Sequence, residues 1–149
     1  MCYYTSGMAC PYFHAVKARG QTDSSRSAML PLGDAWDGVC RADPASTWEP
    51  DEITLLSQCN MGYARGCCAR FPSGDGPDAA RFTISADGPD AVRVYYVLER
   101  DHRPFAHGPL EYSRAGGSMA GDSACDSTLE LARAYVESYL RRISEASAR

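Results

Sequence analysis

The sequence has no long uninterrupted apolar run, although 44% of its 149 residues are hydrophobic. A helix that spans a bilayer needs roughly 20 consecutive apolar residues, so we expect no membrane partner. The first residues lack the basic and apolar regions that direct secretion, and we therefore expect a cytoplasmic protein. The charged fraction of 23% is ordinary for a globular chain, and the length suits one domain over residues 1–149.

Several motifs of common enzyme classes are also missing. The sequence contains no phosphate-binding glycine loop, no dinucleotide-binding fingerprint and no internal repeat, which argues against a nucleotide-dependent enzyme and a repeat architecture. The formal net charge is −4 at pH 7. Because affinity for phosphate depends on neutralisation by Lys and Arg, we expect no nucleic acid among the partners.

The two halves of the chain differ in composition. Residues 1–72 hold six of the seven cysteines and both tryptophans, with prolines and glycines at a density that predicts loops and turns. One short helix is predicted here, because Pro50 suits a first helical position and Gly62 can serve as a C-terminal cap. Its inward-facing residues are predicted to be Ile53, Leu56 and Met61.

Residues 79–149 are predicted to form regular structure. Alternating apolar and polar residues predict an antiparallel hairpin with strands at 81–86 and 92–99 and a turn at 87–90. A third strand is predicted at 110–112. These strands are expected to form a small antiparallel sheet.

A C-terminal helix is predicted from Ser127 and Glu130, which match a capping box. Helical spacing assigns its apolar face to Leu129, Ala132, Val136, Tyr139, Leu140 and Ile143. We therefore predict an α+β fold in which a loop-rich, cysteine-bearing N-terminal half packs on the small antiparallel sheet and this helix.

The densest run of candidate functional residues is the segment 59–72, which places three thiols within ten residues beside two glycines. An odd number of cysteines and an expected reducing compartment disfavour a disulfide framework, so ligands or buried packing are expected. Thiolates are the usual ligands of iron–sulfur clusters. The favoured ligands are Cys10, Cys40, Cys59 and Cys68, with 29, 18 and 8 residues between them.

This dispersed spacing favours a four-iron (4Fe-4S) cluster, because a bulky cluster can accept one ligand from each of several loops. Structural zinc sites more often use close cysteine pairs, so zinc is the alternative. Plain burial of the cysteines as small hydrophobes is a further possibility. Backbone amides around Gly62 and Gly66 are expected to face the centre. The residues expected to exclude water are Tyr12, Phe13, Tyr63 and Phe71.

Other residues offer weaker alternatives. Cys2 and Cys125 are expected to be bystanders, whereas Cys67 and Cys68 are hard to tell apart. A cysteine activated by histidine would need His14, His102 or His107 beside it, and His14 is also close enough to Cys10 in sequence to be a ligand. Asp34 and Asp37 suggest a carboxylate pair, although acids on such a turn more often cap backbone amides.

The cysteine motifs also resemble a pattern in a group of small bacterial proteins for which no activity is established. The similar stretches are Cys10-Pro11-Tyr12-Phe13, Leu30-Pro31-Leu32-Gly33-Asp34 with Gly38 and Cys40, and Cys59-Asn60-Met61-Gly62-Tyr63-Ala64-Arg65-Gly66 with Cys68 and Phe71. The resemblance covers most of the chain. In that pattern the residue before the last cysteine is usually not cysteine, which implies Cys68 as the ligand and not Cys67.

These observations predict an iron–sulfur protein that carries electrons for a protein partner such as a redox enzyme, or assists one. Four protein ligands leave no open iron, so a stand-alone enzyme is not expected. The competing prediction is a protein-interaction module that is stabilised by zinc or contains no metal.

Overall fold

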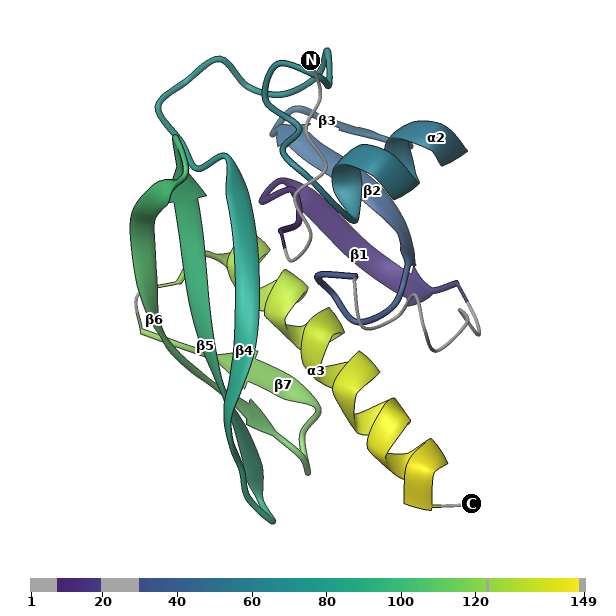
Figure 1. Ribbon diagram of the computed structural model, residues 1–149, viewed down its shortest axis with the longest axis vertical. Helices are drawn as coiled ribbons and strands as arrows, with labels where there is room; N and C mark the ends of the chain where they lie inside the picture. Colours follow the sequence, from purple (N-terminus) through teal and green to yellow (C-terminus); the bar gives the residue numbers. More distant parts are fainter. Residues whose placement is uncertain (1–7, 20–29, 123, 148–149) are drawn as a thin grey trace.

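The computed structural model describes residues 8–19, 30–122 and 124–147, which form two antiparallel sheets with a long helix between them (Figure 1). This arrangement confirms the α+β fold class. The smaller sheet has the order β1-β2-β3, with β1 at Phe13–Ala18, β2 at Trp36–Asp43 and β3 at Ser46–Trp48. The larger sheet has the order β4-β5-β6-β7, with β4 at Ala79–Asp87, β5 at Ala91–Arg100, β6 at Arg103–Ser113 and β7 at Ser118–Ala120. The long helix α3 runs from Asp126 to Ser147.

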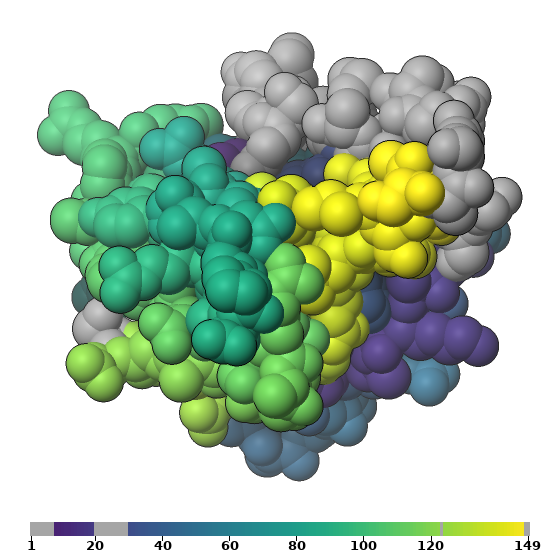
Figure 2. Space-filling view, turned by 90° about the horizontal axis from the view of Figure 1, so that it is seen from below, coloured from purple at the N-terminus to yellow at the C-terminus, as the bar shows by residue number. Residues whose placement is uncertain are grey.

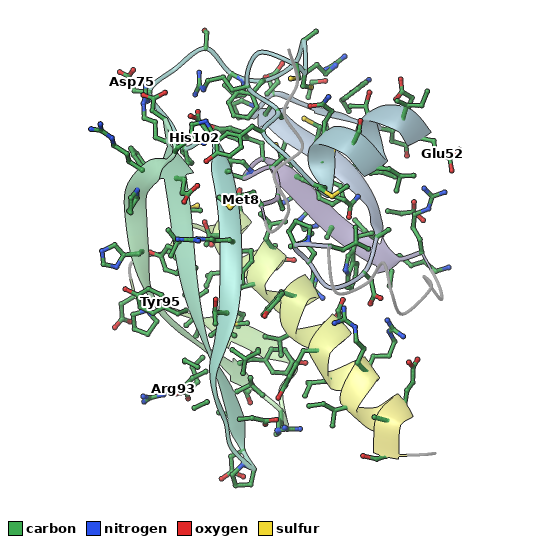
Figure 3. All side chains as sticks on the ribbon, viewed as in Figure 1. Met8, Glu52, Asp75, Arg93, Tyr95 and His102 are labelled. Carbon is green, nitrogen blue, oxygen red and sulfur yellow. The ribbon has the colours of Figure 1, made fainter. Side chains whose placement is uncertain are left out.

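The larger sheet contains the predicted hairpin and third strand. Alternation along β5 buries Val94 and Tyr96 against α3, while Arg93 and Tyr95 extend from the opposite face (Figure 3). The third strand is longer than predicted. It begins after a tight turn at Asp101 and His102, whose φ angles of 52° and 62° are the left-handed pair that closes a two-residue hairpin.

Helix α3 begins one residue before Ser127 and packs between the two sheets, as the view from below shows (Figure 2). Its predicted apolar face is partly correct, because Ala132 and Val136 are fully buried. Ile143 is 41% exposed, and the last turns of α3 diverge from the larger sheet (Figure 1). The residues 128 and 131, which the spacing did not select, are buried as well.

The smaller sheet was not predicted from the sequence. Its first two strands pair Phe13 with Cys40, and the register shifts between Ala15 and Lys17. This bulge leaves Val16 57% exposed and breaks the alternation by which a strand is recognised.

The predicted short helix is present, but a different face of it is buried. Its first turn, α2, covers Glu52–Thr54, and a wide turn, η1, covers Leu55–Cys59. Asp51 caps the start by accepting the Thr54 N–H at 2.7 Å. Two of the three predicted inward residues were wrong, because Ile53 is 81% exposed and Leu56 is exposed. Met61 is half-buried, and the buried residues of this segment are Leu55 and Cys59.

The two sheets and α3 share one hydrophobic core, in which Phe13, Leu32, Tyr96 and Val136 are almost completely buried. Within the described part of the chain, no helix is long and apolar enough to cross a membrane.

Candidate functional site: a hollow lined by four cysteines

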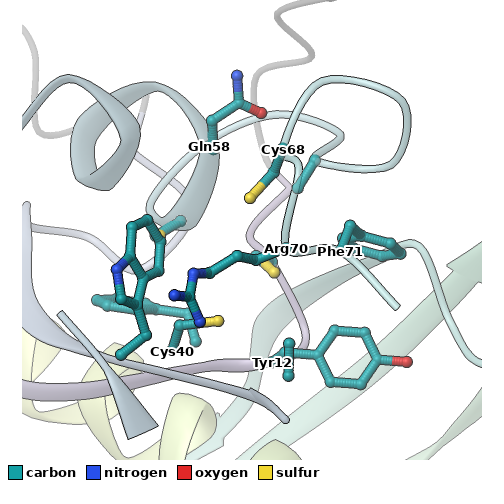
Figure 4. Close-up of a pocket in the computed structure, with 12 residues that line it drawn as sticks. Tyr12, Cys40, Gln58, Cys68, Arg70 and Phe71 are labelled. Atoms are coloured by element: carbon teal, nitrogen blue, oxygen red, sulfur yellow. The ribbon is translucent and has the colours of Figure 1, made fainter. Parts of the chain in front are cut away.

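The four cysteines that the sequence favours as ligands line one small hollow, here called the cysteine hollow (Figure 4). Cys10 precedes β1, Cys40 lies in β2, Cys59 ends η1, and Cys68 lies in the loop that follows. The hollow has a volume of about 10 Å³, which is room for about one water molecule. Its other lining residues are Tyr12, Phe13, Ala42, Trp48, Gln58, Ala64, Arg70 and Phe71.

Backbone hydrogen bonds hold the cysteine-bearing segments around the hollow. The Cys10 N–H donates to the Cys59 carbonyl at 3.1 Å, which joins the segment before β1 to the end of η1. Strand pairing places Cys40 opposite Phe13. The Cys68 N–H donates to the Ala64 carbonyl at 2.7 Å and fixes the last cysteine on a tight turn. Thiols that are far apart in sequence therefore surround one space.

Asn60 anchors this arrangement from the next position after Cys59. Its side-chain oxygen accepts the Trp36 N–H at 2.8 Å, and its side-chain nitrogen donates to the Trp36 and Leu55 carbonyls at 3.0 and 2.9 Å. The residue is 1% exposed, so these bonds satisfy polar atoms that have no access to water. Asn60 belongs to the cysteine motif, but sequence reasoning assigned it no role.

Arg65 organises the loop that carries Cys68. Its guanidinium pairs with Asp78, which is 3% exposed, and donates to the carbonyls of Pro72 at 3.4 Å and Gly74 at 3.2 Å. The same group lies 4.8 Å from the centre of the Phe71 ring. Arg65 thus contacts the loop at several points and connects it to Asp78. The sequence showed only an isolated basic residue here.

The thiols differ in burial. Cys10 and Cys59 are 7% and 6% exposed, whereas Cys40 and Cys68 are half-buried. Burial raises the pKa of the Cys10 thiol to about 12, and the neighbouring Cys40 and Cys68 add to the rise. Burial and the three other thiols also raise the pKa of Cys59. At neutral pH these groups are therefore protonated, and a bound cation would have to displace their protons.

Two backbone amides approach the Cys10 sulfur. The N–H groups of Tyr12 and Phe13 hydrogen-bond to it and lower its pKa, which opposes the larger effect of burial. The backbone amides that the sequence suggested for hydrogen bonding to the centre, around Gly62 and Gly66, make other contacts or are exposed. Gly62 donates its N–H to the Met8 carbonyl at 2.9 Å, and Gly66 is exposed.

Three of the four predicted aromatic residues line the hollow. Tyr12 and Phe71 meet edge to face with their ring centres 5.3 Å apart, and Phe13 forms part of the floor. Tyr63 lies elsewhere. It donates a 2.6 Å hydrogen bond to Glu99 and packs beside the ring of His102 at 4.5 Å.

The remaining cysteines lie outside the hollow. Cys67 is disulfide-bonded and does not line it, whereas its neighbour Cys68 has a free thiol. Cys125 is exposed and lies 3.3 Å from the Thr128 hydroxyl. Cys2 lies outside the described residues. Of the adjacent pair, the structure thus brings only Cys68 to the site.

The histidines do not meet these thiols. His14 lies on the far side of β1, with its Nδ1 atom 4.0 Å from Glu130, and burial together with Arg41 lowers its pKa. His102 stacks on Tyr63, and His107 packs against Tyr95. A histidine-activated cysteine and a His14 ligand are therefore not supported.

Asp34 and Asp37 have different partners and different burial. Asp34 is 1% exposed and pairs with Arg141 of α3, whereas Asp37 is exposed and lies 3.3 Å from Arg19. They do not form a carboxylate pair.

Within the described ranges, no group of three or more His, Cys, Asp and Glu side chains is placed to hold a single metal ion. The four thiols border the hollow without meeting at one point. Comparison with protein families, curated proteins and solved structures found no significant match. The resemblance to the bacterial group stays a prediction, and function is argued from the site alone.

Proposed function

We propose that this protein binds a 4Fe-4S cluster through Cys10, Cys40, Cys59 and Cys68. The observation that supports this most strongly is that cysteines chosen by their sequence spacing, from four separate segments, line one hollow. Such a cluster supplies one-electron transfer when it is bound.

The chemistry of the donor set suits this group. All four candidate ligands are thiols, and aromatic side chains form much of the surrounding wall. The Tyr12 and Phe13 amides, which hydrogen-bond to the Cys10 sulfur, are of the kind that tunes the potential of a cluster. The chain's own residues thus supply ligands, hydrogen bonds and shielding from water.

The cysteine hollow is smaller than a four-iron cluster, since it holds about 10 Å³. Binding therefore requires one wall to move. Cys10 and Cys59 belong to the core and are held by their mutual backbone bond. Cys40 and Cys68 are half-buried, and we expect the loop around Cys68 to move outward.

A single zinc ion suits the arrangement less well. With Zn–S distances of about 2.3 Å, tetrahedral geometry brings the four sulfurs within about 3.8 Å of one another. The four cysteines line the hollow, but among the described residues no group of three or more such ligands is placed to hold one metal ion. A cluster, which spans several atoms itself, needs less convergence.

Four protein ligands leave no iron free for substrate, so the proposed role is electron transfer to a protein partner, or assistance to a redox enzyme. A metal-free interaction module is the second candidate. It is favoured by the burial of Cys10 and Cys59 in the hydrophobic core, where they already pack well without a metal.

The test uses the two half-buried cysteines, whose replacement disturbs the core least. Cys40→Ser and Cys68→Ser proteins are reconstituted anaerobically with iron and sulfide beside the wild type, and bound iron and acid-labile sulfide are measured. We expect each variant to lose at least about half of the wild-type content, because one of four ligands is missing. The matched control is Cys125→Ser, whose thiol does not line the hollow.

Equal iron content in all variants would show that the ligand assignment is wrong. A folded wild type that binds neither iron nor zinc would favour the metal-free module.

A further inference from the structure

A second, more open groove lies beside the cysteine hollow and shares a wall with it. This outer groove has a volume of about 190 Å³, compared with about 10 Å³ for the cysteine hollow. Of the four cysteines that line the cysteine hollow, only Cys40 also lines the outer groove. The lining residues are Cys40, Ala42, Asp43, Ser46, Trp48 and Arg70.

Arg70 places a positively charged side chain in the outer groove, which also contains the carboxylate of Asp43. Its guanidinium lies over the Trp48 ring, 4.4 Å from the ring centre, in a cation–π contact that positions the group. None of the ion pairs within residues 8–19, 30–122 and 124–147 involves Arg70. In Figure 4 its side chain extends across the space between Cys40 and Cys68.

The acidic residue that lines the groove, Asp43, hydrogen-bonds to the backbone. Asp43 accepts the Ala45 N–H at 2.9 Å and so closes the turn between β2 and β3. This hydrogen bond holds the Asp43 carboxylate at the turn, and none of the ion pairs within the described residues joins it to Arg70. A planar guanidinium with free donors suits a carboxylate ligand in particular.

We propose that the outer groove binds a small disulfide that carries a carboxylate, with the carboxylate on Arg70 and the sulfur at Cys40. The volume limits the ligand to a small molecule, Arg70 selects its charge, and the Cys40 thiol gives it a reaction partner.

The reaction with Cys40 is thiol–disulfide exchange. Cys40 loses its proton to solvent, and its sulfur attacks one sulfur of the ligand. The new Cys40–sulfur bond forms as the ligand's sulfur–sulfur bond breaks, and the displaced thiolate takes up a proton. Cys40 is oxidised to a mixed disulfide, and the released half of the ligand is reduced to a thiol.

The ligand is inferred from the geometry of the outer groove alone. Its effect on cluster binding, in contrast, rests on the proposed function. A mixed disulfide at Cys40 removes one of the four proposed ligands. The small ligand would then control whether the cysteine hollow can hold a cluster.

The experiment uses the full chain, free of metal and reductant, and two symmetrical disulfide probes. Dithiodipropionate carries a carboxylate at each end, and bis(hydroxyethyl) disulfide is a neutral compound of similar size. The rate of modification at each cysteine is followed by peptide mass mapping. The exposed Cys125, which lies next to Asp126 and lines neither space, is the internal comparison.

We expect the anionic probe to modify Cys40 faster than the neutral probe does. Arg70→Gln should lower this anionic-to-neutral ratio about three- to fivefold, the change expected for one partly exposed ion pair, and leave the ratio at Cys125 unchanged. Arg103→Gln, which removes an exposed arginine at the start of β6, should change neither ratio.

An unchanged ratio at Cys40 in Arg70→Gln, or faster modification of Cys68 than of Cys40, would overturn the proposal. Because the protein contains no iron in this experiment, such a failure is separate from a failure of the proposed cluster function.

Discussion

The side chain of Asn60 hydrogen-bonds to the backbone of Trp36 in both directions, accepting its N–H at 2.8 Å and donating to its carbonyl at 3.0 Å. The Trp36 indole donates in turn to the Ser138 hydroxyl of α3 at 3.2 Å. The residue next to Cys59 is thus fixed to the start of β2, the strand that carries Cys40, and from there to the long helix. The position of two candidate ligands depends on this one amide.

Replacing Asn60 should therefore destabilise the fold and displace Cys59. Asn60→Ala leaves the buried Trp36 N–H and the Trp36 carbonyl without their partner, whereas the Leu55 carbonyl keeps the backbone N–H of residue 60. We expect a loss of about 2–4 kcal/mol in the free energy of unfolding. Chemical denaturation of the metal-free protein measures it. Gln58→Ala, two positions away and only half-buried, should cost less than about 1 kcal/mol. Similar losses in both variants would contradict the anchoring role.

Arg65 and Asp78 should show strong energetic coupling. Arg65→Met leaves the Asp78 carboxylate buried without its cation, for which we expect a cost of about 3–5 kcal/mol. The double variant Arg65→Met/Asp78→Asn should recover part of this loss, because the uncompensated charge is gone. A double-mutant cycle by urea denaturation measures the coupling, and strictly additive losses would show that the pair does not hold the loop.

The buried thiols should make the metal-free protein less stable at alkaline pH. A thiol whose pKa is higher in the folded chain stabilises the fold below its unfolded pKa, and this contribution is lost as pH rises towards the folded value. For Cys10, with a folded pKa of about 12 and an ordinary value of 9.0, the loss between pH 8 and pH 10 is about 1 kcal/mol.

The measurement is the free energy of unfolding at both pH values, under anaerobic conditions. In Cys10→Ala the fall between them should be smaller than in the wild type by about this amount. Cys125→Ser, which lacks only an exposed thiol, should keep the wild-type fall. An unchanged fall in Cys10→Ala would show that this thiol is not buried in solution.

Phe71 should control access of reagents to the hollow. Its ring packs on Tyr12 and under Arg65, so Phe71→Ala opens that wall. We expect alkylation of Cys68 by iodoacetamide to become at least about threefold faster, because less local opening is needed. Phe105→Ala, in β6 and 50% exposed, should leave the rate unchanged. Equal rates in the wild type and Phe71→Ala would show that this ring does not shield the thiol.

The sequence predicted the elements whose pattern is local. Strand β5 was recognisable because its inner residues, such as Val94, alternate with polar ones, and the C-terminal helix because its apolar residues recur at helical spacing. The common location of the four cysteines was also predictable, since their number and neighbours suggested one site.

The parts that were missed depend on contacts between distant residues. The bulge in β1 hid a strand, and the pairing of β1 with β2 could not be read from either segment alone. Asn60 acts through Trp36, 24 positions earlier. The side chain of Arg70 is positioned by Trp48, and that of Arg65 by Asp78. The sequence shows the type of each residue. The roles of Asn60, Arg65 and Arg70 depend on which distant residues the fold brings into contact with them.

The most direct test of the central claim is anaerobic purification of the untagged protein, followed by its visible spectrum and by quantification of iron, acid-labile sulfide and zinc. We predict a brown protein with broad visible absorption and about four irons and four sulfides per chain. Stoichiometric zinc, or a colourless and well-folded protein without metal, would contradict the claim that Cys10, Cys40, Cys59 and Cys68 hold a cluster.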